Sequence, residues 1–210
     1  MKILILTNGE YGDYSFCKDI SGYDKVICAD NGMKHARHLG IVPDYIIGDF
    51  DSSAQEDLVY FKEKNSTIYK VPQIKDETDT ELAMDKAISL GASYVDIYGG
   101  VGSRMDHTLG NIHLLYKALR SDVRVSLVNS NNNIVLIEDA VVLEGEVGQL
   151  VSLIPFTEEV TGVNTCGLAY KLADGIFEMG KPYGVSNYMT EKEAKVEIKT
   201  GKLLVIKSND

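Results

Sequence analysis

The first half of the chain alternates short apolar runs with longer amphipathic stretches. The short runs are rich in β-branched residues and apolar at nearly every position, as expected for strands of a parallel sheet covered on both faces. They span residues 3–6, 26–28, 45–47, 67–71, 94–98 and 123–128. Because strands interleaved with helices form βαβ units, this half predicts a Rossmann-like α/β domain with a mostly parallel sheet.

Two of the intervening stretches have clear helical periodicity. In residues 79–90, polar Glu81, Asp85 and Ser89 recur every four residues, apolar residues fill the other side, and Gly91 is the C-terminal stop. A second helix is predicted for residues 106–119, with Asp106 as its N-cap. Its apolar residues at helical spacing are Leu109, Ile112, Tyr116 and Leu119.

The pattern changes beyond about residue 129. Short β-type runs at 134–137, 141–143, 150–154, 194–198 and 203–206 are separated by turns predicted at Gly145, Gly162, Gly175 and Gly201. Residues 194–199 alternate apolar and charged side chains, which is typical of a half-exposed antiparallel strand. We therefore expect a small all-β sandwich or barrel over residues 131–210, after an α/β domain over residues 1–130. The boundary is placed in the asparagine-rich run 129–133.

Composition and charge exclude several classes of protein. Hydrophobic residues make up 44% and charged residues 25%, the usual balance of a soluble globular protein. The net charge of -10, without a lysine or arginine cluster, disfavours binding to nucleic acid. No signal peptide and no apolar run of about 20 residues are seen, so we expect no membrane contact. Cys17, Cys28 and Cys166 form no CxxC pair, which favours reduced thiols and a cytoplasmic location.

Carboxylates follow three of the predicted strands. Asp30 comes after residues 26–29, and Asp49 and Asp51 come after residues 45–48. Asp76 and Asp79 follow the end of the strand predicted at 67–71. Ligands of open α/β sheets bind beyond the carboxyl ends of the strands, so these acids are expected to converge on one rim.

Convergence of several carboxylates requires a compensating charge. Two carboxylates about 4 Å apart repel by about 4 kcal/mol at an effective dielectric constant of 20. Magnesium favours one or two carboxylates together with substrate phosphates, so the pattern points to phosphoryl chemistry. An alternative for single residues is helix capping, because Asp51 or Ser52 could cap a helix over residues 54–64.

A glycine-rich segment, residues 99–107, joins a predicted strand to a predicted helix. Gly100 and Gly102 allow backbone N–H groups to approach phosphate oxygens, and Arg104 adds a positive charge. His107 and Asn111 fall on the same helical face as Arg104, although a structural role for His107 is an open alternative. The Walker pattern GxxxxGK[ST] is missing.

Two histidines outside this segment have a spacing that metal sites sometimes use. They are His35 and His38, and no third ligand lies near them in the sequence. For this pair a solvated helix face is expected instead.

The residues now described resemble, in order, the motifs of bacterial thiamine pyrophosphokinases. The resemblance runs through nearly the whole chain, in the segments Ala29-Asp30-Asn31-Gly32, Gly48-Asp49-Phe50-Asp51-Ser52, Asp76-Glu77-Thr78-Asp79, Gly99-Gly100 to Asn111, Gly167-Leu168-Ala169-Tyr170 and Ser186-Asn187. Asn31 stands where the family commonly has a second glycine, and Asn tolerates left-handed backbone angles. Tyr170 stands where other members carry tryptophan, and either ring can stack on a cationic thiazolium.

The resemblance implies a catalytic α/β domain followed by a thiamine-binding β-sandwich, working as a homodimer with active sites between chains. The implied reaction is ATP plus thiamine giving AMP plus thiamine diphosphate, with Mg²⁺ as cofactor. The implied magnesium and catalytic acids are Asp49, Asp51 and Asp76, with Asp79 or Asp76 as the candidate general base. The expected ATP-binding residues are Asp30, Gly32, Gly100, Gly102, Arg104, His107 and Asn111. The implied thiamine-binding residues are Tyr170, Ser186 and Asn187.

Two other functions are compatible with parts of this pattern. Asp49-Phe50-Asp51-Ser52 also resembles the nucleophilic turn of haloacid-dehalogenase-type phosphatases. Those enzymes place the turn after their first strand, whereas here two predicted strands precede it. A non-catalytic nucleotide- or thiamine-sensing module is the other alternative.

Overall fold

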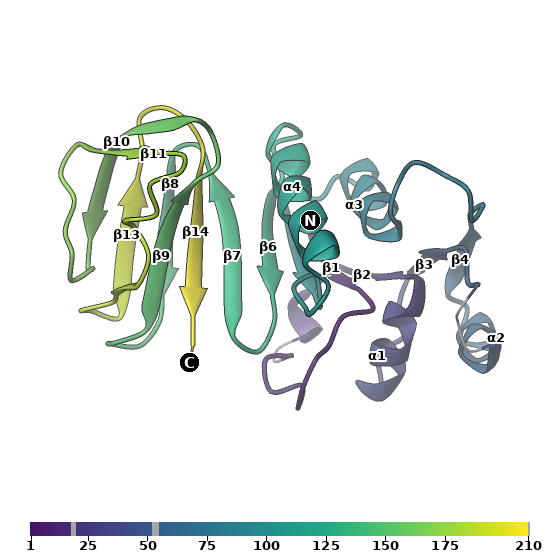
Figure 1. Cartoon of the computed structure of the whole chain (residues 1–210). Helices are drawn as coiled ribbons and strands as arrows, with labels where there is room; N and C mark the ends of the chain where they lie inside the picture. Colours follow the sequence, from purple (N-terminus) through teal and green to yellow (C-terminus); the bar gives the residue numbers. More distant parts are fainter. Residues whose placement is uncertain (18–19, 52–54, 210) are drawn as a thin grey trace. The chain divides into compact units, whose positions relative to one another are not determined.

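The computed structural model describes residues 1–17, 20–51 and 55–209 (Figure 1). It divides into two compact units, Met1–Ser130 and Asn131–Asp210. The first unit is α/β with a parallel sheet, and the second is built from antiparallel strands, so the predicted fold class is confirmed. No helix in the described part of the chain is both long and apolar enough to cross a membrane.

The first unit is organised around a parallel sheet in which every predicted strand is present. Its strands are β1 (Lys2–Leu6), β2 (Lys25–Ala29), β3 (Tyr45–Gly48), β4 (Thr67–Lys70), β5 (Tyr94–Tyr98) and β6 (Arg124–Val128). Their order is β6-β5-β1-β2-β3-β4, and all five neighbouring pairs are parallel. All carboxyl ends therefore lie at one edge of this sheet, as the acidic residues require.

Helices cover both faces of this sheet. The helical segments are η1 (Ile20–Gly22), η2 (Asp30–Gly32), α1 (Met33–His38), α2 (Gln55–Glu63), α3 (Asp79–Ser89) and α4 (Met105–Leu119). α1 and α2 lie on one side of the sheet, and α3 and α4 lie on the other (Figure 1). Met33 and Phe61 are fully buried against Leu4 and Leu6 of β1 in one apolar cluster. Burial of each such side chain contributes about 1.5–3 kcal/mol.

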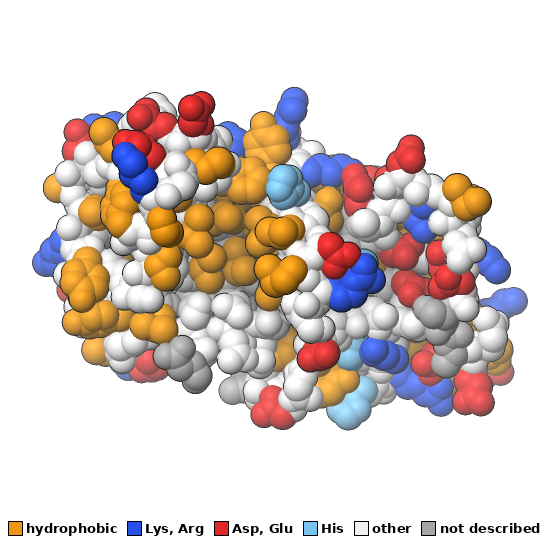
Figure 2. Space-filling view, in the orientation of Figure 1, with side chains coloured by type: hydrophobic (Ala, Val, Ile, Leu, Met, Phe, Trp, Pro, Cys, Tyr) orange, Lys and Arg blue, Asp and Glu red, His pale blue; other side chains and the backbone are white. Residues whose placement is uncertain are grey.

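α4 differs from its prediction in two respects. It begins at Met105 with Arg104 as N-cap, so Asp106 lies in the first turn and is not the cap. Half of the predicted apolar stripe faces outward, because Leu109 is 52% exposed and Tyr116 is 37% exposed, whereas Ile112 and Leu119 are partly buried. The buried face is made instead by Thr108, Asn111, Leu114, Leu115 and Ala118. Hydrophobic side chains are accordingly visible on the surface of α4 in Figure 2.

The second unit is a sandwich of two antiparallel sheets. Its strands are β7 (Asn132–Ile137), β8 (Ala140–Glu144), β9 (Leu150–Pro155), β10 (Glu159–Cys166), β11 (Gly175–Glu178), β12 (Asn187–Tyr188), β13 (Glu193–Glu197) and β14 (Leu203–Ser208). One sheet has the order β12-β9-β14-β7 and the other β11-β10-β13-β8. The apolar core includes Val151, Val160, Phe177, Val196 and Val205.

Two predicted turns of this unit prove to be parts of strands. Gly162 lies inside β10, where the pairing with β11 shifts register between Val160 and Val163, and its φ of +67° marks a bulge. Gly175 begins β11. The bulge interrupts the alternation of apolar and polar residues along β10, and for this reason the periodicity did not predict that strand.

Candidate active site

A pocket of about 450 Å³ lies at the carboxyl edge of the parallel sheet. It is lined by the loops that follow β1, β2 and β5 and by the first turns of α3 and α4. The lining residues are Thr7, Asn8, Gly9, Glu10, Ala29, Asp30, Glu77, Thr78, Asp79, Thr80, Gly99, Gly100, Gly102, Ser103, Arg104, His107, Thr108 and Asn111. Its size and position are those of a small-ligand site in an α/β protein.

The loops after β1 and β5 approach each other at backbone distance. A Cβ atom added to Gly9 would lie 2.0 Å from the carbonyl oxygen of Gly99, so a larger residue there would force one of the two loops to move. The hydroxyls of Thr7 and Tyr11 both donate to the carbonyl oxygen of Tyr98, at 3.0 and 2.8 Å. The two loops therefore form one rigid wall of the pocket.

Side chains of α4 and of the segment after β6 hold the glycine-rich loop. The Asn111 amide donates to the carbonyl oxygen of Gly100 at 2.7 Å, and it does so in a buried position. The Thr108 hydroxyl accepts from the N–H of Gly102 at 3.2 Å. Asn129 donates to the carbonyl oxygen of Val101 at 3.4 Å. Asn111 thus lines the pocket while shaping the loop, a role that its helical spacing alone did not indicate.

The exposed side chain of Arg104 places a positive charge at the rim of this loop. The Arg104 side chain is 69% exposed and donates two hydrogen bonds to the carboxylate of Asp106, which holds the pKa of that carboxyl below its usual value. His107 Nε2 lies 4.0 Å from the same carboxylate. Solvent screens an exposed ion pair of this kind, so Arg104 can exchange Asp106 for a phosphate at little cost.

The acidic turn after β3 has a strained backbone. Phe50 is buried yet has a φ of +60°, a conformation that costs a bulky residue on the order of 1–3 kcal/mol. The turn is closed by Asp49, whose Oδ1 accepts the N–H of Asp51 at 3.1 Å. Gly48 packs against Asp30, because a Cβ at Gly48 would lie 2.9 Å from the Asp30 Cα. Ser52 lies outside the described residues, so the predicted N-cap of α2 also falls outside them.

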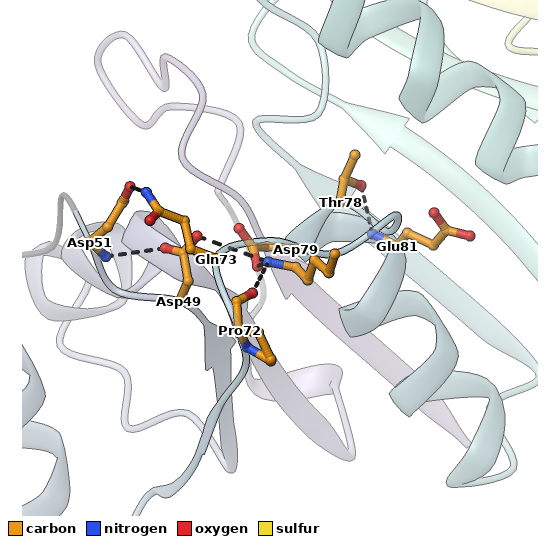
Figure 3. A network of polar contacts seen from close by, with 8 residues as sticks. Asp49, Asp51, Pro72, Gln73, Thr78, Asp79 and Glu81 are labelled. Carbon is orange, nitrogen blue, oxygen red and sulfur yellow. Dashed lines mark hydrogen bonds and ion pairs between the residues drawn. The ribbon is translucent and has the colours of Figure 1, made fainter.

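Lys75 lies between two of the predicted acids. Its ammonium is 3.1 Å from Asp79 Oδ1 and 4.0 Å from Asp49 Oδ2, and it donates to the carbonyl oxygen of Pro72 at 3.3 Å (Figure 3). Asp51 instead accepts a hydrogen bond of 2.8 Å from Gln73, and Asp76 is exposed. Burial raises the pKa of Asp79, against the opposing effect of Lys75. The structure therefore brings Asp49 and Asp79, not Asp51 and Asp76, around one cation.

The donor set suits magnesium only in combination with a substrate. Within residues 1–17, 20–51 and 55–209, no three His, Cys, Asp or Glu side chains are gathered closely enough to hold a metal by themselves. Two carboxylates from separate loops do converge on a single positive charge, that of Lys75. Magnesium takes its remaining ligands from phosphates and water, so a carboxylate pair of this kind fits it.

The residues predicted to bind thiamine lie close together in the second unit. The Asn187 side chain is buried, accepts the N–H groups of Tyr170 and Tyr188 at 3.0 and 2.9 Å, and donates to the carbonyl oxygen of Tyr170 at 2.9 Å. The Tyr170 ring is 67% exposed and meets the Tyr188 ring edge-on at 6.1 Å. Ser186 is exposed with a φ of +64°. Asn187 thus fixes the backbone that presents the Tyr170 ring.

Comparison with known families agrees with this arrangement. Residues 16–127, more than half of the chain, match the family model described as thiamin pyrophosphokinase, catalytic domain. The chain belongs to the thiamin pyrophosphokinase family. Residues 139–205 match the model of the vitamin B1 binding domain of the same family. Because the chain belongs to this family, the phosphatase interpretation of the acidic turn is set aside.

Two bacterial members of the family match over all or nearly all of their length. Thiamine pyrophosphokinase of Bacillus subtilis (strain 168) is 28% identical over 216 residues, covering 100% of both chains. Its crystal structure superposes with a TM-score of 0.90 over 100% of both chains. The thiamin pyrophosphokinase structure from Geobacillus thermodenitrificans has 27% identity and a TM-score of 0.86, covering 100% of this chain and 98% of that one.

Most residues expected to contact ATP line the pocket of this family member. They are Asp30, Gly100, Gly102, Arg104, His107 and Asn111. Gly32 does not line it, because Gly32 is buried against β1, where an added Cβ would lie 2.0 Å from the carbonyl oxygen of Leu6. The prediction missed Lys75 and the loop from Thr7 to Glu10. That loop follows the first predicted strand, so the rule that ligands bind beyond strand ends could have found it.

His35 was expected on a solvated face and is in fact buried beside the pocket wall. It is 5% exposed, stacks on Tyr11 with ring centroids 3.7 Å apart, and has Nδ1 2.7 Å from the Tyr14 hydroxyl. His38 is exposed and stacks on Tyr14. Burial, aided by the nearby charge of Lys34, lowers the His35 pKa to about 4. The ring is therefore neutral at pH 7 and serves packing.

This low pKa predicts a loss of stability in mild acid. An unfolded histidine has a pKa of about 6.5, so below that pH the unfolded state binds the proton first and the free energy of unfolding falls until about pH 4. Between pH 7 and pH 5 we expect His35 to account for a decrease of about 2 kcal/mol. Urea unfolding at the two pH values measures it. The decrease is expected to shrink in His35→Gln and to persist in His113→Gln, which alters an exposed histidine; equal pH dependence in all three proteins contradicts the assignment.

Proposed function

We propose that this chain transfers the diphosphoryl group of ATP to the hydroxyl of thiamine, giving thiamine diphosphate and AMP. The observation that carries the proposal is one pocket that joins a glycine-rich loop with Arg104 to the carboxylates Asp30 and Asp79, in a chain matching both domains of the family. Residues 1–130 are assigned to catalysis and residues 131–210 to thiamine binding.

The triphosphate of ATP is placed along the glycine-rich loop. No heavy atom lies within 4 Å of a Cβ added to Gly102, so the loop leaves open space for a phosphate beside that residue. Arg104 supplies a positive charge that is fixed at every relevant pH. His107, exposed at the first turn of α4, and Asp30, at the end of β2, bound the same space. Asn111 contributes indirectly, by holding the glycine-rich loop in position.

Asp49, Asp51 and Asp76 would hold Mg²⁺, with Asp79 beside them. The ion would screen the charge of the triphosphate and stabilise the charge that develops on the leaving oxygen of AMP. The convergence of Asp49 and Asp79 on a cation supports this assignment. Exposed Asp51 and Asp76 lie in the two loops that carry these acids, so they can approach a bound ion.

Asp79 is the better candidate for accepting the proton of the thiamine hydroxyl. It lines the pocket, whereas Asp76 is exposed and absent from the lining. Its raised pKa makes its carboxylate a stronger base than an ordinary aspartate. General-base help usually amounts to about 10²–10⁴-fold, so orientation of the hydroxyl toward the β-phosphorus and electrostatics contribute the larger part.

We propose that thiamine binds at the Tyr170 end of the sandwich and that the enzyme is a homodimer whose sites combine residues of two chains. The exposed Tyr170 ring suits stacking on a cationic thiazolium. Exposed Met105, Leu109 and Tyr116 on α4 give an apolar surface for an interface. Light scattering of the purified chain, which has a mass of 23.1 kDa, is expected to give twice that mass.

The reaction is tested by incubating the protein with ATP, MgCl₂ and thiamine and separating the products by chromatography. AMP and thiamine diphosphate are expected in equal amounts. ADP with thiamine monophosphate would refute diphosphoryl transfer.

Two controls separate this reaction from the other candidate activities. Omission of thiamine is expected to abolish AMP formation. Release of phosphate from simple phosphate esters without thiamine would instead indicate a phosphatase, and saturable binding without any AMP would indicate a sensing module.

A further inference from the structure

Lys75 is a charged residue beside the acidic loops, and the proposed mechanism assigns it no role. Its side chain is only 12% exposed, and its ammonium lies 3.1 Å from Asp79 Oδ1, 4.0 Å from Asp49 Oδ2 and 3.3 Å from the carbonyl oxygen of Pro72. Lysine usually keeps its ammonium in water, so an ammonium turned inward between two carboxylates is a specific arrangement. The contacts come from the loop after β3, the loop after β4 and the start of α3.

The ammonium neutralises the same carboxylates that would attract a divalent cation. Burial is the main cause of the raised pKa of Asp79, and the negative charges of Asp30 and Asp49 raise it further. Without Lys75 these acids would repel one another across a partly buried space. A metal ion that approaches Asp49 and Asp79 must therefore displace Lys75 or share the carboxylates with it.

We propose that Lys75 is a built-in counter-cation that makes divalent-cation binding depend on the nucleotide. The inference rests on the proposed function, because the triphosphate of ATP is what offers the ammonium a new partner. When Mg²⁺ arrives with ATP, Lys75 leaves Asp49 and Asp79 and pairs with a phosphate oxygen. Free Mg²⁺ brings no such partner, so it binds the nucleotide-free protein weakly.

The test measures metal and nucleotide affinity separately in wild type, Lys75→Met and Lys75→Arg. Calorimetric titration of MgCl₂ into nucleotide-free protein is expected to show at least about tenfold tighter binding in Lys75→Met, because removal of the ammonium leaves the carboxylates uncompensated. Lys75→Arg, which keeps the charge, is expected to bind Mg²⁺ as weakly as wild type. In steady-state assays, Lys75→Met is expected to raise KM for ATP about tenfold, more than it lowers kcat.

Lys62→Met is the matched control, because Lys62 is an exposed lysine of α2 and its loss changes the net charge equally. It is expected to leave both affinities unchanged. If Lys75→Met does not fold, as judged by circular dichroism, Lys75→Gln replaces it and retains a donor for Pro72. The proposal is overturned if the folded neutral variant binds free Mg²⁺ no more tightly than wild type.

The outcomes distinguish this proposal from the proposed function. The calorimetric titration contains neither ATP nor thiamine, so it does not depend on turnover. Wild-type formation of AMP and thiamine diphosphate together with an unchanged Mg²⁺ affinity in Lys75→Met overturns the role of Lys75 alone. Tighter Mg²⁺ binding in Lys75→Met without AMP formation by wild type supports the counter-cation and overturns the reaction.

Discussion

Replacement of Asp49 by asparagine is expected to lower kcat for AMP formation about a hundred- to thousandfold while the protein stays folded. The change removes the carboxylate that faces Lys75 and, by our proposal, the metal. Loss of one preorganised electrostatic group at a reacting centre commonly has this size of effect. The fold should persist, because the asparagine Oδ1 can still accept the N–H of Asp51 and close the turn.

The measurement is kcat for AMP formation at saturating ATP and thiamine, with circular dichroism melting to check the fold. Asp122→Asn is the matched control, since it makes the same chemical change at an exposed residue just before β6, at the opposite edge of the sheet. Asp122 has a φ of +58°, which asparagine tolerates. Turnover of Asp49→Asn within tenfold of wild type would remove Asp49 from the catalytic centre.

Replacement of Gly9 by alanine is expected to destabilise the chain by about 1–3 kcal/mol and to weaken ATP binding strongly. The new methyl group would lie 2.0 Å from the carbonyl oxygen of Gly99, and the atoms that it meets are backbone atoms that cannot rotate away, so one loop must move. Either movement displaces the pocket wall that Thr7 and Tyr11 attach to Tyr98. The loss of stability and the loss of affinity should therefore occur together.

Urea unfolding gives the change in stability, and calorimetric titration with ATP and MgCl₂ gives the change in affinity. Gly22→Ala serves as the control, because a Cβ at exposed Gly22 meets nothing within 4 Å. Alanine at position 9 with unchanged stability and unchanged ATP affinity would show that the two loops are not packed as described.

The architecture of the first unit could be predicted because all its strands except the edge strand β4 are mostly buried and appear as continuous apolar runs. In the second unit, periodicity located the regular strands but missed β10, β11 and β12. β10 contains a bulge at Gly162, and β12 is only two residues long, so neither shows a period. Exposed Leu109 and Tyr116 of α4 have the spacing of a buried helical face, so their exposure could be learned only from the packing of the helix.

The sequence predicted most of the loops that form the candidate site, but it did not predict which side chains contact one another there. Strand ends indicated where Asp30, Asp49 and Asp79 would gather, whereas the partner of Asp49 and Asp79 depended on the path of the loop that carries Lys75. Asn111 faced the pocket as expected, but its amide hydrogen-bonds to Gly100. Such assignments follow from tertiary geometry, which spacing along one helix does not contain.

The strand order of the parallel sheet has a consequence for folding during synthesis. β1 is made first but lies in the interior of the sheet, between β2 and β5. On the ribosome, one edge of β1 therefore remains unpaired until residues 94–98 have emerged, and non-local parallel pairing of this kind is slow. Gly9 and Gly99 lie in the loops that follow these two strands, so the pocket would be among the last parts of the unit to form. By our proposal, a nascent chain would not bind ATP until β5 has paired with β1.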